Sequence, residues 1–440
     1  MAPGGGRAAV CRRGANRLDS RAMNVIIAGG GIGGLTLALC LDHAGIECEV
    51  YEAAPEFKPL GVGINLLPHS VRVLTILGLQ HELATSGIPT AELIYYSKHG
   101  QRIWAEPRGQ FAGYRWPQYS IHRGELQMLL LDEVYKRIGP ERVFTGTALA
   151  SFEHREGCVE ARFIDRQTGR ASATATGDVL VGADGIHSAT RHLFYPDEPT
   201  PRFSGRLLWR GVTESEPFLT GRSMIMAGSA NQKFVAYPIS AEAAGRGRSL
   251  VNWVAELPIG GDEEPTRDWN REVAKERFLP AFAGWRFDWL DVPALISGAE
   301  HIYEFPMSDR DPVERWSFER VTLLGDAAHP MYPIGSNGAS QAILDAADLA
   351  ETLKAQPDAV AALREYESHR LPPTSRIVLA NRQQGPEAVM QLVEERAPDG
   401  FERLDEVISQ DELEEVANRY KQLAGFDKES LNAKEDTSLA

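Results

Sequence analysis

The stretch Gly29-Gly30-Gly31-Ile32-Gly33-Gly34 decides the fold of the first part of this chain. The β-branched run at 24–28 precedes it, and the apolar run at 35–41 has the length and propensity of a buried helix. A strand, a glycine turn and a helix in this order are typical of a dinucleotide-binding unit. Gly29 permits the tight turn, Gly31 lets the backbone approach a pyrophosphate, and Gly34 lets the helix pack against the strand.

A carboxylate follows at the place where such a unit needs one. The second apolar strand, at 47–51, ends at Glu52, which we expect to accept hydrogen bonds from the ribose hydroxyls of an adenosine. A glycine-rich turn without a ligand is the alternative interpretation. The strand, the helix and the terminal Glu52 together favour the nucleotide site.

The sequence at 123–131 predicts a second helix whose apolar side packs on the sheet. Arg123 and Gln127 are four residues apart and therefore share one edge of this helix. We interpret the pair as ligand contacts. An ordinary arginine at a helix start, in contact with water, is the alternative.

A second glycine-bearing segment follows an apolar strand at 178–181 and contains Asp184. In open α/β sheets ligands bind at the carboxyl ends of the strands, so we expect Asp184 to accept from a hydroxyl of the nucleotide. Arg191 lies at the start of the helix that follows. Its two interpretations are support for nearby phosphates and support for the loop itself.

The third segment, at 325–330, sets Asp326 after another apolar strand. A helix that begins near Gly338 would direct its free N–H groups back toward Asp326 and form a second anion site. His329 stands in a tight turn before a proline, and we interpret it as a hydrogen-bonded structural residue and not as a general base.

Between the second and third segments, residues 203–304 are rich in strands and aromatic residues, with a helical section predicted around 269–289. No nucleotide fingerprint occurs there, so this sheet is predicted to provide a wall for an organic substrate. Trp209 and Tyr237 are the candidate substrate contacts. The alternative for both is a place in the core, which is usual for an aromatic residue in a strand.

Composition narrows the function classes. The chain has 440 residues and a net charge of -15, which argues against nucleic acid, because a nucleic-acid binder needs clustered Lys and Arg. Its cysteines form no close-spaced pair, so neither a metal site nor a dithiol centre is predicted; they are Cys11, Cys40, Cys48 and Cys158. No stretch is a credible membrane span, and we expect a cytoplasmic protein with reduced cysteines.

The fold class that follows is α/β: a Rossmann-like domain with a parallel sheet, an inserted mixed or antiparallel β-sheet domain for the substrate, and C-terminal helices. The arginine-bearing residues 1–22 are predicted to be a disordered leader. The predicted nucleotide-binding domain is discontinuous, and the boundaries are 23–90, 120–200 and 306–383 for that domain, 91–119 and 201–305 for the substrate domain, and 384–440 for an acidic helical tail.

Over about 23–370 the three segments resemble the signatures of the single-component FAD-dependent aromatic monooxygenases, the para-hydroxybenzoate and salicylate hydroxylase group. Within that group the chain is most similar to the phenazine-pathway members, on dispersed residues such as those at 60–65 and 117–127. The resemblance implies that FAD contacts Gly29, Gly31, Gly34, Glu52, Arg123, Asp184 and Asp326. It also implies that Pro333 and the backbone of Gly338 and Ala339 border the reactive ring.

The resemblance further implies a reaction. NADH or NADPH reduces FAD, O2 forms a flavin C4a-hydroperoxide, and one oxygen atom hydroxylates an aromatic or N-heteroaromatic substrate. If the substrate is a carboxylate, hydroxylation at the carboxyl-bearing carbon expels carbon dioxide. Only one dinucleotide fingerprint is present, so the nicotinamide is expected to visit transiently as a co-substrate. No acid or base and no metal is predicted in the site, and the oligomeric state stays open.

Two alternatives share the fold. One is a flavin-dependent reductase or a halogenase, although the Trp-x-Trp-x-Ile-Pro segment of the halogenases is absent and Trp285 and Trp289 have a different spacing. The other is a non-catalytic, protein-binding member such as the GDP-dissociation inhibitors. The Asp184-Gly185 and Gly325-Asp326 segments favour an enzyme over that second alternative.

Overall fold

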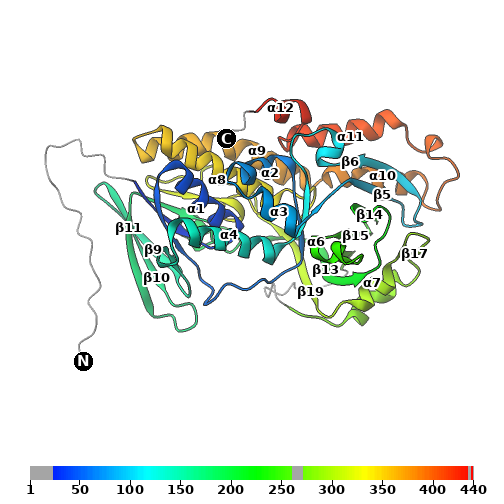
Figure 1. Cartoon of the computed structure of the whole chain (residues 1–440), viewed down its shortest axis with the longest axis horizontal. Coiled ribbons are helices and arrows are strands. Elements are labelled where there is room, and N and C mark those ends of the chain that lie inside the picture. Colours follow the sequence, from blue (N-terminus) through cyan, green and yellow to red (C-terminus); the bar gives the residue numbers. More distant parts are fainter. Residues whose placement is uncertain (1–22, 260–270, 435–437, 440) are drawn as a thin grey trace.

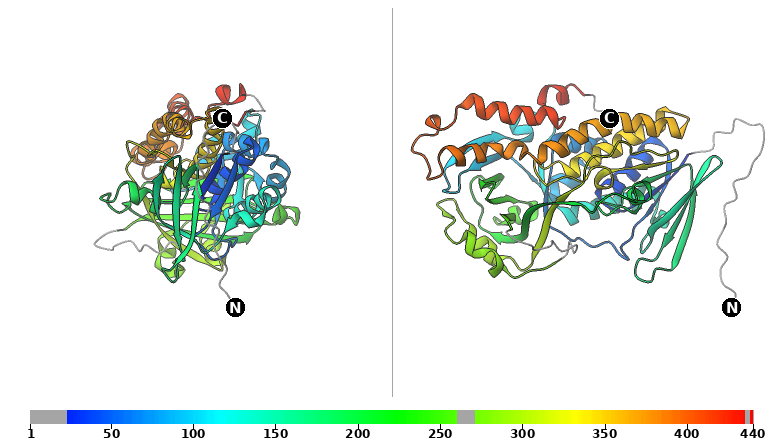
Figure 2. Two further views of the ribbon diagram at one scale, coloured as in Figure 1. Left: turned by 90° about the vertical axis from the view of Figure 1, so that its left-hand side faces the viewer. Right: turned by 180° about the vertical axis from the view of Figure 1, so that it is seen from behind.

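The computed structural model describes residues 23–259, 271–434 and 438–439, so the predicted leader at 1–22 lies outside the described residues. The molecule is elongated in Figure 1, with a nucleotide-binding part at one end and a large twisted sheet at the other. The C-terminal helices lie along one long edge and reach both parts, as the view from behind in Figure 2 also shows.

The first part is built on a five-stranded sheet in the order β20-β12-β1-β2-β8, in which every pairing is parallel. The sequence predicted β1 and β2 with the bounds that the structure has. The strands are β1 (Asn24–Ala28), β2 (Glu47–Tyr51), β8 (Val143–Phe144), β12 (Val179–Gly182) and β20 (Val321–Leu323).

Alternation along β1 explains how this sheet is covered. Val25 and Ile27 pack among helix residues on one face, whereas Ile26 and Ala28 pack against a three-stranded antiparallel sheet on the other. The helices of the first face are α1 (Ile32–Ala44), α4 (Arg123–Ile138) and α8 (Gly338–Ala355). The covering strands are β9 (Ala148–Arg155), β10 (Cys158–Ile164) and β11 (Ala171–Gly177).

The second part is a seven-stranded mixed sheet in the order β19-β13-β16-β15-β14-β5-β6, antiparallel except where β14 pairs with β5. It therefore joins two insertions in the nucleotide-binding part, because β5 and β6 lie between β2 and β8 and the other five strands lie between β12 and β20. Its strands are β5 (Glu92–Tyr96), β6 (Arg102–Pro107), β13 (Arg202–Ser215), β14 (Ser223–Ser229), β15 (Gln232–Pro238), β16 (Ser249–Pro258) and β19 (Ile302–Asp309).

A small sheet connects the two parts in space. In it, β7 lies between β3 and β4, and α2 and α3 follow β3 along the chain. The elements are β3 (Gly63–Leu66), α2 (Pro68–Ile76), α3 (Gln80–Ser86), β4 (Ile88–Pro89) and β7 (Tyr119–His122). Short α-helices join strands: α5 (Ala189–Phe194) follows β12, α6 (Ala241–Gly245) precedes β16, and α7 (Val292–Gly298) precedes β19.

The prediction of a helical section around 269–289 was wrong for the part of it that the structure describes, residues 271–289. From residue 271 on, the chain forms the single 3-10 turns η3 (Lys275–Arg277) and η4 (Leu279–Phe282) and the hairpin of β17 (Arg286–Phe287) and β18 (Leu290–Asp291). Phe278, Phe282 and Trp285 are buried at helical spacing, which explains the error. Pro280 and Gly284 interrupt the helix, because proline lacks an N–H donor and glycine is a weak helix former.

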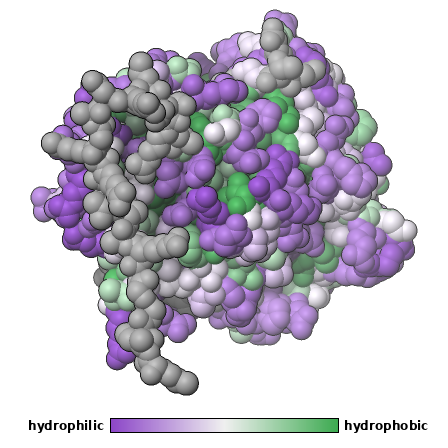
Figure 3. Space-filling view, turned by 60° about the vertical axis from the view of Figure 1, so that its left-hand side comes forward, coloured by the Kyte–Doolittle hydropathy of each residue, from purple (hydrophilic) through white to green (hydrophobic). Residues whose placement is uncertain are grey.

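After α8, the chain continues through the long helix α9 (Ala359–Asn381) toward the seven-stranded sheet (Figures 1 and 2). The tail is helical as predicted and contains α10 (Ala388–Arg396), α11 (Gln410–Leu423) and α12 (Lys428–Asn432). None of the described helices combines the length and apolar character that crossing a bilayer requires. Hydrophilic residues predominate on the face drawn in Figure 3, with apolar residues between them near its centre.

Candidate functional site

Three of the five glycines in the first segment differ in what surrounds them. Gly29 has φ 116°, and a Cβ there would lie 2.3 Å from the carbonyl oxygen of Ala183. A Cβ on Gly34 would lie 2.0 Å from the carbonyl oxygen of Gly29, so strand and helix touch backbone to backbone. A Cβ on Gly31 would meet nothing within 4 Å. The open space at Gly31, directly before α1, fits a pyrophosphate at the helix N-terminus.

Glu52 and Gln127 both hold the glycine segment. The Glu52 carboxylate accepts from the N–H of Gly30 at 2.7 Å and from the N–H of Ala54 at 2.7 Å. Each carboxylate oxygen keeps a lone pair for another donor such as a ribose hydroxyl. Gln127 donates from Nε2 to the carbonyl of Gly30 at 2.9 Å, so α4 is tied to the same loop.

Arg123, the first residue of α4, lies near enough to Asp326 for its charge to act on that carboxyl. The Arg123 side chain is exposed, and its guanidinium makes no hydrogen bond to the part of the chain that the structure describes. Asp326 is accessible to solvent but lies in a recess, and this partial desolvation raises its pKa, an effect that the charges of His329 and Arg123 reduce. An unpaired cation opposite a carboxylate in a recess suits a ligand with both phosphates and hydroxyls.

His329 is a structural residue, as the sequence indicated. Its Nε2 lies 2.5 Å from Oδ2 of Asp345, whose Oδ1 accepts from Arg370 at 2.8 Å. Burial raises the pKa of Asp345, but the charges of His329 and Arg370 outweigh this effect and hold it below its ordinary value. The same carboxylate accepts from the N–H of Gly325 at 3.0 Å, so this buried network fixes the turn that carries Asp326.

Asp184 and Arg191 form a second structural network beside the recess. Asp184 accepts from the hydroxyl of Ser188 and from the N–H of Thr190, the latter at 3.0 Å, and burial raises its pKa. Arg191 is 1% exposed and donates to the carbonyls of Ala327 and Ala328 at 3.2 and 2.7 Å. Of its two interpretations, support for the loop is therefore the one that the structure confirms.

The loop of residues 333–337 and the start of α8 complete the recess. Pro333 is exposed, and a Cβ on Gly338 would meet nothing within 4 Å. Asn337 is the N-cap residue of α8, but its side chain does not cap the helix, so N–H groups at this end are free of a side-chain partner. The open start of α8, with Gly338 and Ala339, has room for a flat ring that carries negative charge.

The two aromatic candidates of the second sheet occupy different faces. Trp209 is 3% exposed, donates from Nε1 to Glu304 at 2.9 Å and stacks on Phe278 with ring centroids 4.7 Å apart. It belongs to the dry core, so the structure gives it the packing role that the sequence left as the alternative. Tyr237 lies on the other face, where its hydroxyl donates to the carbonyl of Gly63 at 2.9 Å.

Strand parity explains this difference. Successive side chains of β13 point to opposite faces, so Arg210 points away from its neighbour Trp209. Arg210 donates to the carbonyl of Gly63 at 2.8 Å, which identifies its face as the one that meets the nucleotide-binding part. The residues that could form a substrate wall are therefore those whose side chains lie on the same face of the sheet as Arg210.

On that face, a cavity of about 280 Å³ opens beside the 333–337 loop, with Tyr332, Ile334 and Met307 on its apolar side. Four cations and two carboxylates also line it: Arg202, Arg206, Lys233, Arg382, Glu256 and Glu387. The volume is close to the lower end of the range for small-molecule sites.

Lys233 lies at the centre of these charges. It is 7% exposed, pairs with Glu256 at 2.7 Å and also contacts Glu387. Burial raises the pKa of Glu387, whereas for Glu256 the nearby charges of Lys233 and Arg206 outweigh burial and lower the pKa.

This charged cluster was not predicted from the sequence. A charged residue such as Lys233 within the apolar strand β15 was the signal that could have revealed it.

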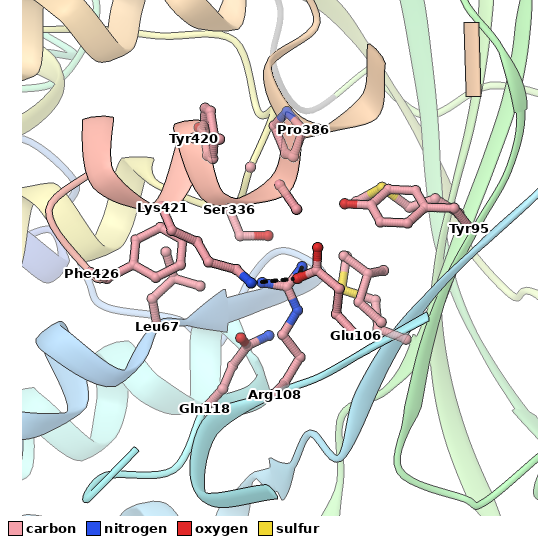
Figure 4. Close-up of a pocket in the computed structure, with 15 residues that line it drawn as sticks. Leu67, Tyr95, Glu106, Arg108, Gln118, Ser336, Pro386, Tyr420, Lys421 and Phe426 are labelled. Carbon is pink, nitrogen blue, oxygen red and sulfur yellow. Dashed lines mark ion pairs between the residues drawn. The ribbon is translucent and has the colours of Figure 1, made fainter. Parts of the chain in front are cut away.

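Figure 4 shows a second, much smaller cavity on the same face of the sheet. There Glu106 lies 3.3 Å from Arg108 and 3.0 Å from Lys421, and the hydroxyl of Tyr95 points toward the cavity. Its volume of about 20 Å³ is enough for a water molecule and too small for an aromatic ring. Of these two cavities on the sheet face, the one beside Lys233 therefore has room for a substrate.

Comparison with known proteins agrees with this geometry. A family model described as an FAD binding domain matches residues 22–380. The chain belongs to this FAD-binding family. It is 48% identical to the phenazine 1,6-dicarboxylic acid hydroxylase PhzS of Lysobacter antibioticus over 82% of this chain and 89% of that protein. It is 36% identical to the 3-amino-4-hydroxybenzoate 2-monooxygenase PtnB3 of Streptomyces platensis over 87% and 94% of the two chains.

Among solved structures, Klebsiella pneumoniae HpxO complexed with FAD and uric acid superposes with a TM-score of 0.68 at 25% identity, covering 95% of this chain and 96% of that one. The protein is thus an FAD-dependent monooxygenase that hydroxylates an aromatic or heteroaromatic substrate. These relatives favour the hydroxylase over the reductase, halogenase and non-catalytic alternatives.

Proposed function

We propose that this monooxygenase hydroxylates an N-heteroaromatic carboxylate of the phenazine class, with NADH or NADPH as the reductant. The observation that carries the proposal is the cationic cavity beside the 333–337 loop. The 48% identity to a phenazine dicarboxylate hydroxylase supports the ring class. We propose Tyr237 only as a residue of the substrate wall near Gly63, because its hydroxyl is already hydrogen-bonded to the carbonyl of Gly63.

The charge balance of the cavity favours an anion. Arg206 and Lys233 are paired with Glu256, and Arg382 pairs with Asp309 at 2.6 Å. Arg202 is exposed and makes no hydrogen bond or ion pair within the described part of the chain, so it is available to a carboxylate. Guanidinium and ammonium groups bind carboxylates through charge-assisted hydrogen bonds.

The residues of the recess would hold FAD. Gly31 and the start of α1 offer room for the pyrophosphate, Glu52 and Asp326 offer acceptors for hydroxyls, and Arg123 offers a cation. The full proposed set is Gly29, Gly31, Gly34, Glu52, Arg123, Gln127, Asp184, Asp326, Gly338 and Ala339, with Pro333 beside the reactive ring. Bound FAD supplies the two-electron chemistry and the activation of O2.

The chain's own part in the reaction is to orient the substrate and to exclude water. Tyr332, Ile334 and Met307 form an apolar side that would receive the ring, while the cations hold the carboxylate. Hydroxylation at the carboxyl-bearing carbon would break the bond to the carboxylate and release carbon dioxide. One oxygen atom of O2 enters the ring, the other leaves as water, and the nicotinamide supplies the two electrons.

The cytoplasm is the compartment that we infer for this reaction, because it supplies NADH and NADPH. Cys40, Cys48 and Cys158 are buried thiols that form no disulfide within the described part of the chain, as expected in a reducing compartment. Cys11 lies outside the described residues. The acidic net charge of -15 argues against nucleic acid as a partner.

The test is a substrate screen with product identification. The purified holoenzyme is supplied with phenazine-1,6-dicarboxylate, quinoline carboxylates or salicylate, and oxidation of NADH and of NADPH is followed. We expect the heteroaromatic carboxylates to stimulate oxidation and to yield products that gain oxygen and lose carbon dioxide by mass spectrometry. Phenazine without a carboxylate is the matched control.

Two results would count against the proposal. Equal turnover of phenazine and its carboxylates would show that the cationic cavity recognises no anion. A product that retains every carboxylate would exclude the decarboxylating route.

A further inference from the structure

The C-terminal helix α11 touches the 333–337 loop through Tyr420, as Figure 4 shows. Tyr420 is 5% exposed. Its hydroxyl accepts from Nδ2 of Asn337 at 2.9 Å and donates to Oδ1 of Asn381, the last residue of α9, at 2.8 Å. The carbonyl oxygen of Ile334 lies 3.3 Å from the same hydroxyl. One phenol group thus joins the loop to two C-terminal helices.

Packing leaves the Tyr420 ring little freedom. A Cβ on Gly335 would lie 2.1 Å from its hydroxyl oxygen, and a Cβ on Gly385 would lie 2.9 Å from its ring atom Cε2. The ring is therefore inserted between two glycine backbones, one in the loop and one in the 3-10 turn η6 (Gly385–Glu387). Such close approach requires glycine at both positions.

The loop that Tyr420 contacts has an unusual backbone. Gly335 has φ 68° and Ser336 has φ 58°. Consecutive residues in the left-handed region, one of them not glycine, form a conformation that a free loop would rarely keep. Contacts from outside the loop must therefore hold it in this shape, and Tyr420 provides the hydrogen bond to its last residue, Asn337.

We propose that Tyr420 is a positioning residue that holds the 333–337 loop and the start of α8 in the shape that receives the flavin ring. This rests on the proposed placement of the ring at Pro333, Gly338 and Ala339. Free N–H groups at the start of α8 stabilise negative charge, which a reduced flavin ring carries. Loosening the loop should therefore weaken FAD binding and lower the midpoint potential of the bound flavin.

Tyr114, which lies between β6 and β7, offers a control because it also holds the C-terminal segment. Its hydroxyl donates to the carbonyl of Phe426 at 2.7 Å and not to the loop. Tyr114→Phe and Tyr420→Phe each remove one phenol hydroxyl that holds the tail, but only the second breaks the bond to Asn337. A role in tail stability alone predicts that any change in FAD affinity follows the loss of Tm in both variants.

The experiment compares the two variants with the wild-type holoenzyme. We expect both to lose a few degrees of Tm, and Tyr420→Phe to lose more, because its hydroxyl bonds Asn381 as well as Asn337. Only Tyr420→Phe should raise the FAD dissociation constant, by about 5–10-fold, shift the visible flavin spectrum, lower the midpoint potential and release more hydrogen peroxide per nicotinamide oxidised. Wild-type spectrum, potential and FAD affinity in Tyr420→Phe would overturn the proposal.

A double-mutant cycle keeps the test decisive if a variant is unstable. Asn337→Ala breaks the same bond from the loop side, so its effect on the flavin potential should be much smaller in the Tyr420→Phe background than in the wild type. Additive effects would contradict the proposed link. If the wild type oxidises no aromatic carboxylate, the substrate proposal fails, while FAD affinity and potential still test Tyr420.

Discussion

The two faces of the seven-stranded sheet have opposite characters. One face carries Trp209, Phe234 and Trp253 in a dry aromatic cluster. The other meets the nucleotide-binding part, and Arg206 and Lys233 line its cavity. Neighbouring residues of one strand therefore serve different purposes, and aromatic character by itself does not identify a substrate wall. On this sheet, buried charge is the better guide to the site, because burying a charge is costly unless partners or a ligand compensate.

The largest expected effect concerns the dry face. Trp209→Ala should reduce the free energy of unfolding by about 3–5 kcal/mol, because it leaves a cavity beside Phe278 and removes one of the hydrogen-bond donors to Glu304. Denaturant unfolding measures this change. KM for the substrate should stay within about twofold of the wild type in the folded fraction, since Trp209 faces away from the cavity. A large rise in KM with unchanged stability would reverse the assignment of the two faces.

An intermediate effect is expected at the cavity mouth. Arg202→Gln should raise KM for a heteroaromatic carboxylate about 3–10-fold, because it removes an unpaired and partly solvated charge. Stability and FAD affinity should not change. Arg222→Gln is the control: Arg222 is also exposed, next to β14 of the same sheet, but it does not line the cavity. Steady-state kinetics that change equally in both variants would indicate general charge attraction and not a binding site.

The smallest effect is expected at Glu387, whose pKa is raised by burial. As the pH falls toward this raised pKa, the Glu387 carboxyl becomes neutral. The positive charge of Lys233 is then less compensated and attracts an anionic substrate more strongly. KM for the carboxylate should therefore decrease modestly with falling pH. Glu387→Gln mimics the neutral form and should lower KM about 2–3-fold while reducing its pH dependence. An unchanged KM–pH profile in this variant would show that another group titrates.

Much of the nucleotide-binding part could be predicted because its signals are local. The turn at Gly29, the apolar helix after it and the strand ending at Glu52 lie within about thirty residues, as a βαβ unit requires. The positions of Asp326 and Gly338 could be predicted for the same reason. Asp326 lies in the turn that follows β20, and Gly338 is the first residue of α8. The role of Arg191 stayed open, because only the fold brings it to the carbonyls of Ala327 and Ala328.

The sequence alone determined the FAD-binding fold and the residues at the turns that build it, because turn conformation and strand or helix periodicity depend on neighbours in the chain. The tertiary structure alone decided which sheet face meets the cofactor, since strand order and register in β13–β16 set that face. It also decided that Tyr420 reaches Asn337, which is 83 residues earlier in the chain. Such contacts depend on how distant elements pack, and no local pattern encodes them.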